Sequence, residues 1–308
     1  MNESGRGPIL PWLSLLTIWI VWGSTYLGMN AAVQTIPPFF MTAMRFFLAA
    51  PIILLFAVPS LRRGEAKPTS VQVRNSAMVG VILLLGGTGL GALAQRYLDS
   101  SFAALMVSLS PIFMSLFTSL KIKKAPDKKL LGALVVGLVG IAIMIGGPGS
   151  GAVSITGVII ITVSIVLWAY GTVISRFMDM PHNSFITSGV QMVAGGISLI
   201  LLAIPFGEFQ ELDINAISRA SWIGFIWLVL AGSVLAYTAY LYANKTLPIE
   251  IVSTYAYVNP IIAVILGATL NQESIGPNVL IGGSVILLAV VFIVSGHIAR
   301  KGPIKRMG

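Results

Sequence analysis

Ten apolar stretches, each long enough to cross a lipid bilayer, constrain the fold of this chain more than any other feature of its sequence. A helix needs about 20 predominantly apolar residues to span the hydrocarbon core of a membrane. The chain is 56% hydrophobic and 9% charged, whereas a soluble domain has about 25% charged residues. The sequence therefore predicts an all-α polytopic membrane protein embedded in the lipid bilayer. The ten predicted transmembrane helices are Trp12–Val33, Pro38–Ser60, Ser76–Leu98, Ser100–Leu120, Leu130–Gly147, Ile155–Phe177, Asn183–Pro205, Ser221–Ala243, Ile251–Leu270 and Val279–Ile298.

The basic residues predict how these helices are oriented. If the chain crosses the membrane ten times, 16 of its 19 Lys and Arg residues lie on one side. Arg96 and Arg219 lie on the other side, and Arg45 lies inside the second predicted helix. Because cytoplasmic loops carry the excess of Lys and Arg, we expect both termini in the cytoplasm and a solvated loop at Glu208–Asp213 outside. The net charge of +9 is scattered over short loops, which argues against a nucleic-acid-binding surface.

The two halves of the chain carry matching landmarks. Trp22 and Trp168 are 146 residues apart, and so are the two prolines that close the second and seventh predicted helices. We therefore expect one five-helix repeat over residues 1–148 and a second over residues 149–308. Because five is an odd number, the second repeat should be inverted relative to the first, as in many secondary transporters, with a binding site between the halves.

The fourth and ninth predicted helices are apolar but carry prolines with polar neighbours. The ninth contains STYAYVNPIIAVILG, which includes Pro260, and the fourth contains AALMVSLSPIFMSLF, which includes Pro111. Proline removes a backbone donor and kinks or opens a helix. We therefore predict that Pro111 and Pro260 are hinges of a transport cycle. The alternative is that Pro and Ser are merely tolerated in these membrane helices.

Arg45 is the only charged residue well inside a predicted span. A charge at that depth costs at least ~2.5 kcal/mol, so Arg45 should face a cavity or a partner. One interpretation is that its planar guanidinium binds an anionic group of a substrate. The other is that it binds helix-end carbonyls or nearby hydroxyl groups, or extends to the membrane surface.

Aromatic and polar side chains on the same helices complete the candidate substrate site. Aromatic walls suit apolar, amphipathic or cationic solutes, although some of these rings belong to the interfacial belts of a membrane protein. The glycine-rich stretch GGTGLG of the third helix is predicted to serve close helix packing. The further residues that we predict to bind substrate are Trp22, Tyr26, Asn30, Ser108, Trp168, Tyr170, Gln191, Tyr237, Tyr257 and Asn259.

Three stretches give the chain a resemblance to a known family: IWIVWGSTYLGMN near the start, MRFFLAAPIILL in the second helix and STYAYVNPIIAVILG in the ninth. They resemble the ten-helix EamA-type transporters of the drug/metabolite transporter superfamily, and among these the YedA-like exporters of the bacterial inner membrane. The resemblance implies two EamA-type repeats around a central cavity. It also implies movement of small organic solutes such as amino acids, metabolites or drugs, often outward. Glu273 continues the second-half signature, whereas its first-half counterpart, Lys124, departs from it.

A channel-like facilitator and a membrane-embedded enzyme or lipid-handling protein are the alternative functions. A channel needs a ring of charge or a carbonyl filter, and an enzyme needs a nucleophile with a base, paired carboxylates or a metal cluster. The sequence indicates none of these, so we expect no enzyme activity, no cofactor and no metal. We expect a monomer or a homodimer, with the glycine-containing fifth and tenth helices as a possible contact. Because no acidic residue lies well within a span, we expect facilitated or exchange-type transport, with Glu273 as the reserve position for proton coupling.

Overall fold

The computed structural model describes residues 9–126, 128–146, 153–273 and 275–300. Within these ranges the chain is helical apart from its connecting turns and loops, and it contains no strand. The helices of the first half are α1 (Ile9–Thr17), η1 (Ile18–Trp22), α2 (Gly23–Val33), α3 (Pro38–Arg62), α4 (Ser70–Gly80), η2 (Val81–Gly89), α5 (Leu90–Ala94), α6 (Ser100–Val107), α7 (Ser110–Lys121) and α8 (Lys128–Gly146). The helices of the second half are α9 (Ile155–Ser175), α10 (Ser184–Ala203), α11 (Glu208–Glu211), η3 (Ile214–Ala216), α12 (Arg219–Trp227), η4 (Leu228–Tyr237), α13 (Thr238–Thr246), α14 (Ile249–Val252), α15 (Tyr255–Leu270) and α16 (Pro277–Arg300).

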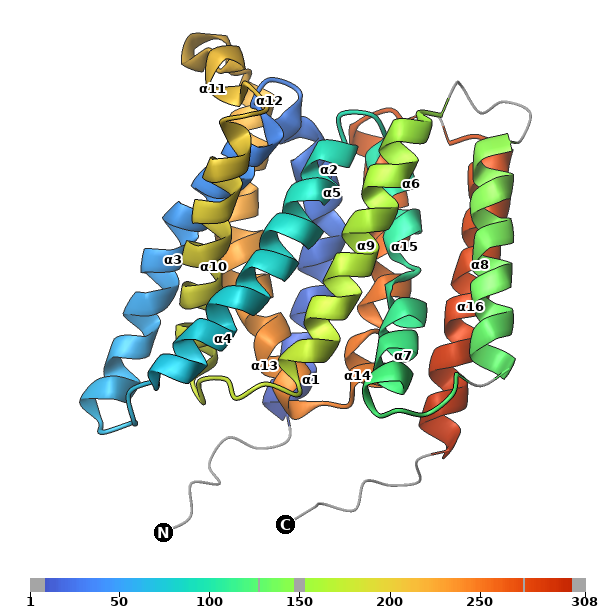
Figure 1. Cartoon of the computed structure of the whole chain (residues 1–308). Helices are drawn as coiled ribbons and strands as arrows, with labels where there is room; N and C mark the ends of the chain where they lie inside the picture. Colours follow the sequence, from blue (N-terminus) through green and yellow to red (C-terminus); the bar gives the residue numbers. More distant parts are fainter. Residues whose placement is uncertain (1–8, 127, 147–152, 274, 301–308) are drawn as a thin grey trace.

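These helices form a bundle in which α1 begins and α16 ends at the same end of the molecule (Figure 1). Eight described helical segments are long and apolar enough to cross a membrane, and two shorter apolar helices, Val258–Leu270 and Pro277–Phe292, follow them. The predicted all-α polytopic fold is therefore confirmed, and the chain is a multi-pass membrane protein.

Large apolar side chains cover the outside of the bundle. Leu55 on α3, Leu138 on α8 and Leu288 on α16 have exposed fractions of 69%, 63% and 69%. Such side chains are unfavourable in water but match the hydrocarbon tails of lipid. The helices meanwhile satisfy their backbone hydrogen bonds internally, as a bilayer requires.

Contacts between the halves surround the centre of the bundle. Helix α3 packs on α10, α9 packs on η2, and α12 packs on α2, so each pair joins one helix from either half. Three of the central spans contain a π-helical segment, namely η1, η2 and η4. Segments η2 and η4 begin at Val81 and Leu228, at corresponding places in the two halves. π-helical turns often occur at functional sites, which directs attention to the space between these spans.

The fourth and ninth spans are broken, in agreement with their proline and polar content. A turn at Ser108 separates α6 from α7, and Pro111 lies in the first turn of α7, where its missing N–H leaves no hydrogen bond unmade. A turn at Ser253 separates α14 from α15, whereas Pro260 lies farther along, inside α15. The break in the ninth span thus precedes the proline at which we expected it.

Helices α8 and α16 pack together at one edge of the bundle (Figure 1). A Cβ atom on Gly282 would lie 2.5 Å from the carbonyl oxygen of Gly140, so glycine is required for this close approach. The glycines of the two helices thus serve their packing on each other. A dimer formed through them stays a prediction.

Candidate functional site

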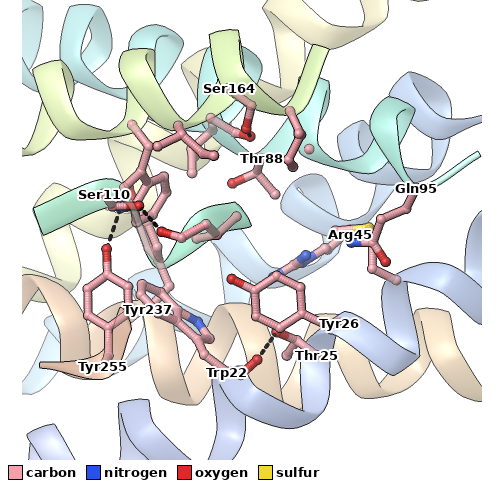
Figure 2. Close-up of a pocket in the computed structure, with 18 of the residues that line it drawn as sticks. Trp22, Thr25, Tyr26, Arg45, Thr88, Gln95, Ser110, Ser164, Tyr237 and Tyr255 are labelled. Carbon is pink, nitrogen blue, oxygen red and sulfur yellow. Dashed lines mark hydrogen bonds between the residues drawn. The ribbon is translucent and has the colours of Figure 1, made fainter. Parts of the chain in front are cut away.

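A cavity of about 130 Å³ lies in the middle of the bundle, between helices of both halves. Figure 2 shows polar and aromatic side chains from several spans converging on it. Among the described residues that line it, Arg45 is the one cation and none is acidic. The lining residues are Trp22, Thr25, Tyr26, Met29, Arg45, Phe46, Leu84, Gly87, Thr88, Gly91, Gln95, Val107, Ser110, Ile161, Ser164, Ile165, Trp168, Tyr237 and Tyr255.

Arg45 extends from α3 into this cavity (Figure 2). It is 5% exposed, and its Nε donates a 2.6 Å hydrogen bond to Oγ of Ser233. Its Cζ lies 5.4 Å from the ring centre of Phe46. Within the described part of the chain, no ion pair and no further hydrogen bond engages the guanidinium. One hydroxyl therefore fixes Nε, the two Nη groups remain available to a ligand, and the side chain does not reach the membrane surface.

Gly232, next to Ser233 on η4, makes room for the guanidinium. A Cβ atom on Gly232 would lie 2.8 Å from Nη2 of Arg45 and 3.0 Å from Cγ2 of Thr25. The carbonyl oxygen of Gly232 accepts a 3.3 Å hydrogen bond from Nε1 of Trp22. One segment of η4 thus places Arg45 and Trp22 next to each other in the cavity wall.

Five aromatic rings close the cavity toward the end where α1 begins, and we call them the aromatic floor. They belong to Trp22, Trp168, Tyr237, Tyr240 and Tyr255. The ring centre of Trp22 lies 5.6 Å from that of Trp168 and 4.9 Å from that of Tyr240. Nε1 of Trp168 donates a 2.9 Å hydrogen bond to the hydroxyl of Tyr255. The ring centre of Trp168 also lies 6.5 Å from that of Tyr237. Several of these pairs meet edge to face, an arrangement that adds specific attraction to apolar burial.

Hydrogen bonds join the aromatic floor to the helices beneath it. The Tyr237 hydroxyl donates a 2.6 Å hydrogen bond to Oε1 of Gln191. The Tyr240 hydroxyl lies 2.6 Å from Oγ1 of Thr172. Gln191 lines a separate hollow of about 440 Å³ at this end of the bundle, and its Nε2 has no partner among the described residues. The floor therefore separates the central cavity from this second hollow.

A larger hollow of about 760 Å³, which we call the vestibule, lies at the end of the bundle that carries α11. Gln95 lines both the vestibule and the central cavity. Asn30 also lines the vestibule, and its Nδ2 donates a 3.4 Å hydrogen bond to the carbonyl oxygen of Gln95. Oδ1 of Asn30 accepts a 3.4 Å hydrogen bond from Asn271. The cavity is thus bordered by polar groups at the α11 end and by aromatic rings at the other.

Glu273 caps the first turn of α6 at the vestibule. Its two carboxylate oxygens accept the backbone N–H groups of Ser100 and Ser101, each at 3.1 Å, and the hydroxyl groups of both serines. Burial raises the pKa of Glu273, but these hydrogen bonds and one from Asn271 outweigh it. They leave the pKa below its ordinary value of 4.5. Glu273 therefore acts as an ionised helix cap in this structure.

Glu208 caps α3 in the same manner. Its carboxylate accepts the backbone N–H groups of Phe39 at 3.0 Å and Phe40 at 2.6 Å. Glu208 is 3% exposed, so the expectation that it lies on a solvated loop surface was wrong. The four free N–H groups at a helix start attract a carboxylate, and this attraction draws Glu208 inward. Glu211 nearby does lie on the surface, where it pairs with Arg96 at 3.1 Å.

Five of the residues that we predicted to bind substrate lie together in the cavity wall. They come from four spans and include the pair of tryptophans that we matched between the halves. Asn30 lies instead in the vestibule and Gln191 beneath the aromatic floor. The five cavity residues are Trp22, Tyr26, Arg45, Trp168 and Tyr237.

The remaining predicted residues are not brought to the cavity. Tyr170 is 40% exposed and packs on Phe117 on the outside of the bundle. Ser108 is buried and donates a hydrogen bond to a carbonyl of its own helix. Asn259 is buried, with its amide group 2.9 Å from the carbonyl oxygen of Trp19. The side chain of Tyr257 lies outside the described residues.

Sequence reasoning did not select several polar residues of the cavity, among them Thr25 from α2, Thr88 and Gln95 from the third span and Ser164 from α9. Oγ of Ser164 donates a 2.6 Å hydrogen bond to the carbonyl oxygen of Gly87. The glycine-rich stretch does pack closely on α9, as expected, but it also lines the cavity. A hydroxyl between glycines of an apolar span was the available signal for Thr88.

Comparisons with known proteins agree with this architecture. The sequence matches the EamA-like transporter family over residues 10–146 and again over residues 155–295. It is 30% identical over 285 residues to the inner membrane transporter YedA of Escherichia coli strain K12, a match that covers 92% of this chain and 90% of the relative. It is 21% identical over 301 residues to the transporter YvbV of Bacillus subtilis, which covers 94% of this chain and 93% of the relative.

A solved protein structure also has the same fold. It superposes on this chain with a TM-score of 0.65 at 17% sequence identity. The match covers 94% of this chain and 97% of the solved chain. The family match takes in both halves of the chain, and the relatives are transporters by name over nearly their whole length. The resemblance that the sequence motifs carried is thereby confirmed, and the chain belongs to the EamA-like transporter family.

Proposed function

We propose that this protein is a secondary-type transporter that moves small organic solutes through the central cavity by alternating access. The observation that carries the proposal is the asymmetry of the cavity, which adjoins a polar vestibule at one end and is closed by the aromatic floor at the other. A carrier needs one site that opens to one side of the membrane at a time. A channel would need a continuous path, and the floor interrupts it.

The breaks in the fourth and ninth spans support movement of the floor. Tyr255, a member of the floor, directly follows the turn between α14 and α15. Oγ1 of Thr254 in that turn accepts a 3.1 Å hydrogen bond from Nε1 of Trp19 on η1. A bend at this turn would therefore displace a ring of the floor and open the cavity toward the second hollow. We propose that Pro111, in the first turn after one break, and Pro260, inside the helix that follows the other, act as hinges of this change.

We further propose that the repeats 1–148 and 149–308 are inverted relative to each other and that both termini are cytoplasmic. The opposite directions in which α1 and α9 cross the bundle support the inversion (Figure 1). The distribution of basic loops supports the orientation. In this orientation the vestibule faces outward. Export across a bacterial inner membrane is the direction that the family resemblance favours.

The polar groups of the site support facilitated or exchange-type transport. Proton-coupled carriers use an intramembrane carboxylate or histidine whose pKa is set by burial. The described lining of the cavity contains neither. Glu273, our reserve position, lies at the start of α6 with a lowered pKa and five hydrogen bonds to neighbouring groups. That environment favours a permanently ionised cap over a proton carrier.

Filling the cavity with a large side chain should block most of the transport without unfolding the protein. Thr88 lines the cavity, so Thr88→Trp occupies the space that a solute would need. We expect purified wild-type protein in liposomes to equilibrate small organic acids, amino acids or amines down their gradients without an imposed pH difference. We expect Thr88→Trp to lower that flux by about tenfold or more, because the indole overpacks the space that a solute must enter in each cycle.

Thr269→Trp is the matched control, because Thr269 lies on the exposed side of α15 and makes only a hydrogen bond within its own helix. It should transport like the wild type. Equal flux through Thr88→Trp and the wild type would contradict transport through this cavity. Accumulation against a gradient that requires a pH step and is lost in Glu273→Gln would contradict the proposed coupling.

A further inference from the structure

Arg45 is a buried cation that forms no ion pair within the described part of the chain. It is 5% exposed, lies within a membrane span and has no described acidic partner, while a single serine hydroxyl engages only its Nε. A buried cation is costly unless it is paired and hydrogen-bonded. Its remaining donors border the cavity. The missing partner is therefore expected in the cavity itself, as part of whatever occupies it.

Building on the proposed transport function, we infer that the substrate is an organic monoanion with an apolar or aromatic body. A carboxylate fits the guanidinium best, because a planar fork of N–H donors binds two carboxylate oxygens at once. The hydrogen bond from Nε to Ser233 and the absence of a side chain on Gly232 hold the fork in one place. The fork is thus prepared before the anion arrives.

The aromatic floor supplies the other half of the recognition. Trp22 lies beside Arg45, because both side chains contact Gly232. The carbonyl oxygen of Gly232 accepts the indole N–H of Trp22, and a Cβ atom on Gly232 would collide with the guanidinium of Arg45. A solute whose anionic group meets Arg45 therefore places its remaining atoms against Trp22 and Trp168. Rings and alkyl chains gain most from such contacts.

The charge of the site limits the class further. One cation and no acidic residue line the described cavity, so a monoanion leaves the occupied site neutral. A cationic solute would face Arg45 without a counter-charge, and a dianion would bring an unpaired negative charge into a low-dielectric space. Aromatic walls by themselves also suit cations, so the head group of the solute is the property to test.

The test uses three probes with one carbon skeleton and different head groups: 3-phenylpropionate, 3-phenylpropan-1-ol and 3-phenylpropylamine. Binding is measured by calorimetry on the full chain in nanodiscs of zwitterionic lipid, which removes anionic lipid as a competing partner of Arg45. We expect the affinity for the acid to be at least about tenfold higher than that for the alcohol or the amine, because hydrogen bonds to a charged group contribute a free energy of this size. Propionate, which has the same head group but lacks the phenyl ring, should bind more weakly than 3-phenylpropionate.

Three substitutions at two positions of α3 separate the site from general charge effects. Arg45→Gln should bring the acid and the alcohol to within about twofold of each other, because the loss falls on the charged head group. Arg62→Gln removes a guanidinium from the exposed end of the same helix and should keep the preference. Arg45→Lys keeps the charge without the fork and should show an intermediate preference. Retained binding of the alcohol by Arg45→Gln shows that this variant is folded.

The inference is overturned if the amine or the alcohol binds the wild type as well as the acid does. It is also overturned if Arg45→Gln keeps the preference for the acid, or if the acid does not bind the wild type at all. Flux through proteoliposomes is measured separately. Transport of amines but not of acids would support the proposed transport function and contradict the inferred substrate class. Binding of the acid at Arg45 without flux of any solute would support the inferred ligand class and contradict the transport function.

Discussion

Gly87 on η2 and Gly232 on η4 each lie directly against a side chain of the site. A Cβ atom on Gly87 would lie 2.7 Å from Cε3 of Trp168, and one on Gly232 would lie 2.8 Å from Nη2 of Arg45. Real Cβ atoms do not approach other atoms so closely, so both side chains depend on the glycine opposite them. At the scale of the residue, the positions of Trp168 and Arg45 in the cavity therefore depend on glycines, which have no side chain to collide with them.

Gly87→Ala should destabilise the protein by about 1–3 kcal/mol, because the added methyl group overpacks the contact with Trp168. Gly132→Ala on α8 is the control, since no atom lies within 4 Å of a Cβ atom at that position. It should be neutral or stabilise the helix by about 0.5–1 kcal/mol. Thermal unfolding in detergent measures both changes. A Gly87→Ala protein as stable as Gly132→Ala would contradict the packing described for η2.

At the scale of the element, carboxylates from the second half of the chain cap helices of the first half. Glu208 follows α10 and caps α3, and Glu273 follows α15 and caps α6. Both helices begin at the vestibule end, where their free N–H groups would otherwise need water or another partner. Each cap also connects the two halves on this side. Any opening on this side that separates α6 from the end of α15 must break the hydrogen bonds of Glu273.

The Glu273 cap gives the stability of the protein a defined pH dependence. The folded-state pKa is below the ordinary value of 4.5, so the ionised cap stabilises the protein fully above that value. The stabilisation is lost as the pH falls through the folded-state pKa. At pH 7 we expect Glu273→Gln to lower the free energy of unfolding by about 1–2 kcal/mol, a value reduced for the partial exposure of the carboxylate.

The difference between wild type and Glu273→Gln should shrink as the pH falls below about 4.5, as followed by thermal unfolding in detergent. Glu211→Gln serves as the control, because Glu211 forms an exposed ion pair with Arg96, and such pairs contribute about 0–1 kcal/mol. A difference for Glu273→Gln that is the same at pH 7 and pH 3.5 would show that the cap does not depend on its charge.

At the scale of the whole molecule, three hollows follow one another along the bundle: the vestibule, the central cavity and the hollow lined by Gln191. The first two share Gln95, whereas the aromatic floor separates the second from the third. Helices of both halves line the vestibule and the central cavity, whereas the third hollow is lined by residues of the second half. The aromatic floor again joins the halves, because Trp22 packs on Trp168 and Tyr240. A rearrangement of one half against the other therefore changes access at both ends together.

The proposed orientation is testable with single cysteines, because the native chain has none. Glu211→Cys lies at the vestibule end and Lys124→Cys near the end of α7, at the opposite end of the bundle. In intact cells a membrane-impermeant maleimide should label Glu211→Cys, while Lys124→Cys should react only after the cells are opened. The opposite pattern would reverse the orientation and turn the vestibule toward the cytoplasm.

The sequence by itself determined the fold class and the family. Within a bilayer, an apolar run of this length must form its backbone hydrogen bonds internally, as a helix does. The spans could therefore be predicted without tertiary information. Arg45 stood out for the same reason, because a charge within such a run must have a partner or a cavity. The matched Trp22 and Trp168 indicated two related halves, and both rings do meet in the cavity wall.

The tertiary structure decided which face of each helix is turned inward. A helix buried in lipid is apolar on both its outer and its packed faces, so hydrophobic periodicity carries little information about its rotation. Trp168 and Tyr170 are two positions apart on α9 and therefore point in nearly opposite directions, at ~100° per residue. Only the packing of α9 on η2 turns Trp168 into the cavity and Tyr170 outward. The same holds for Glu208, which lies in an outer loop by sequence and is buried only because α3 begins where its carboxylate can reach.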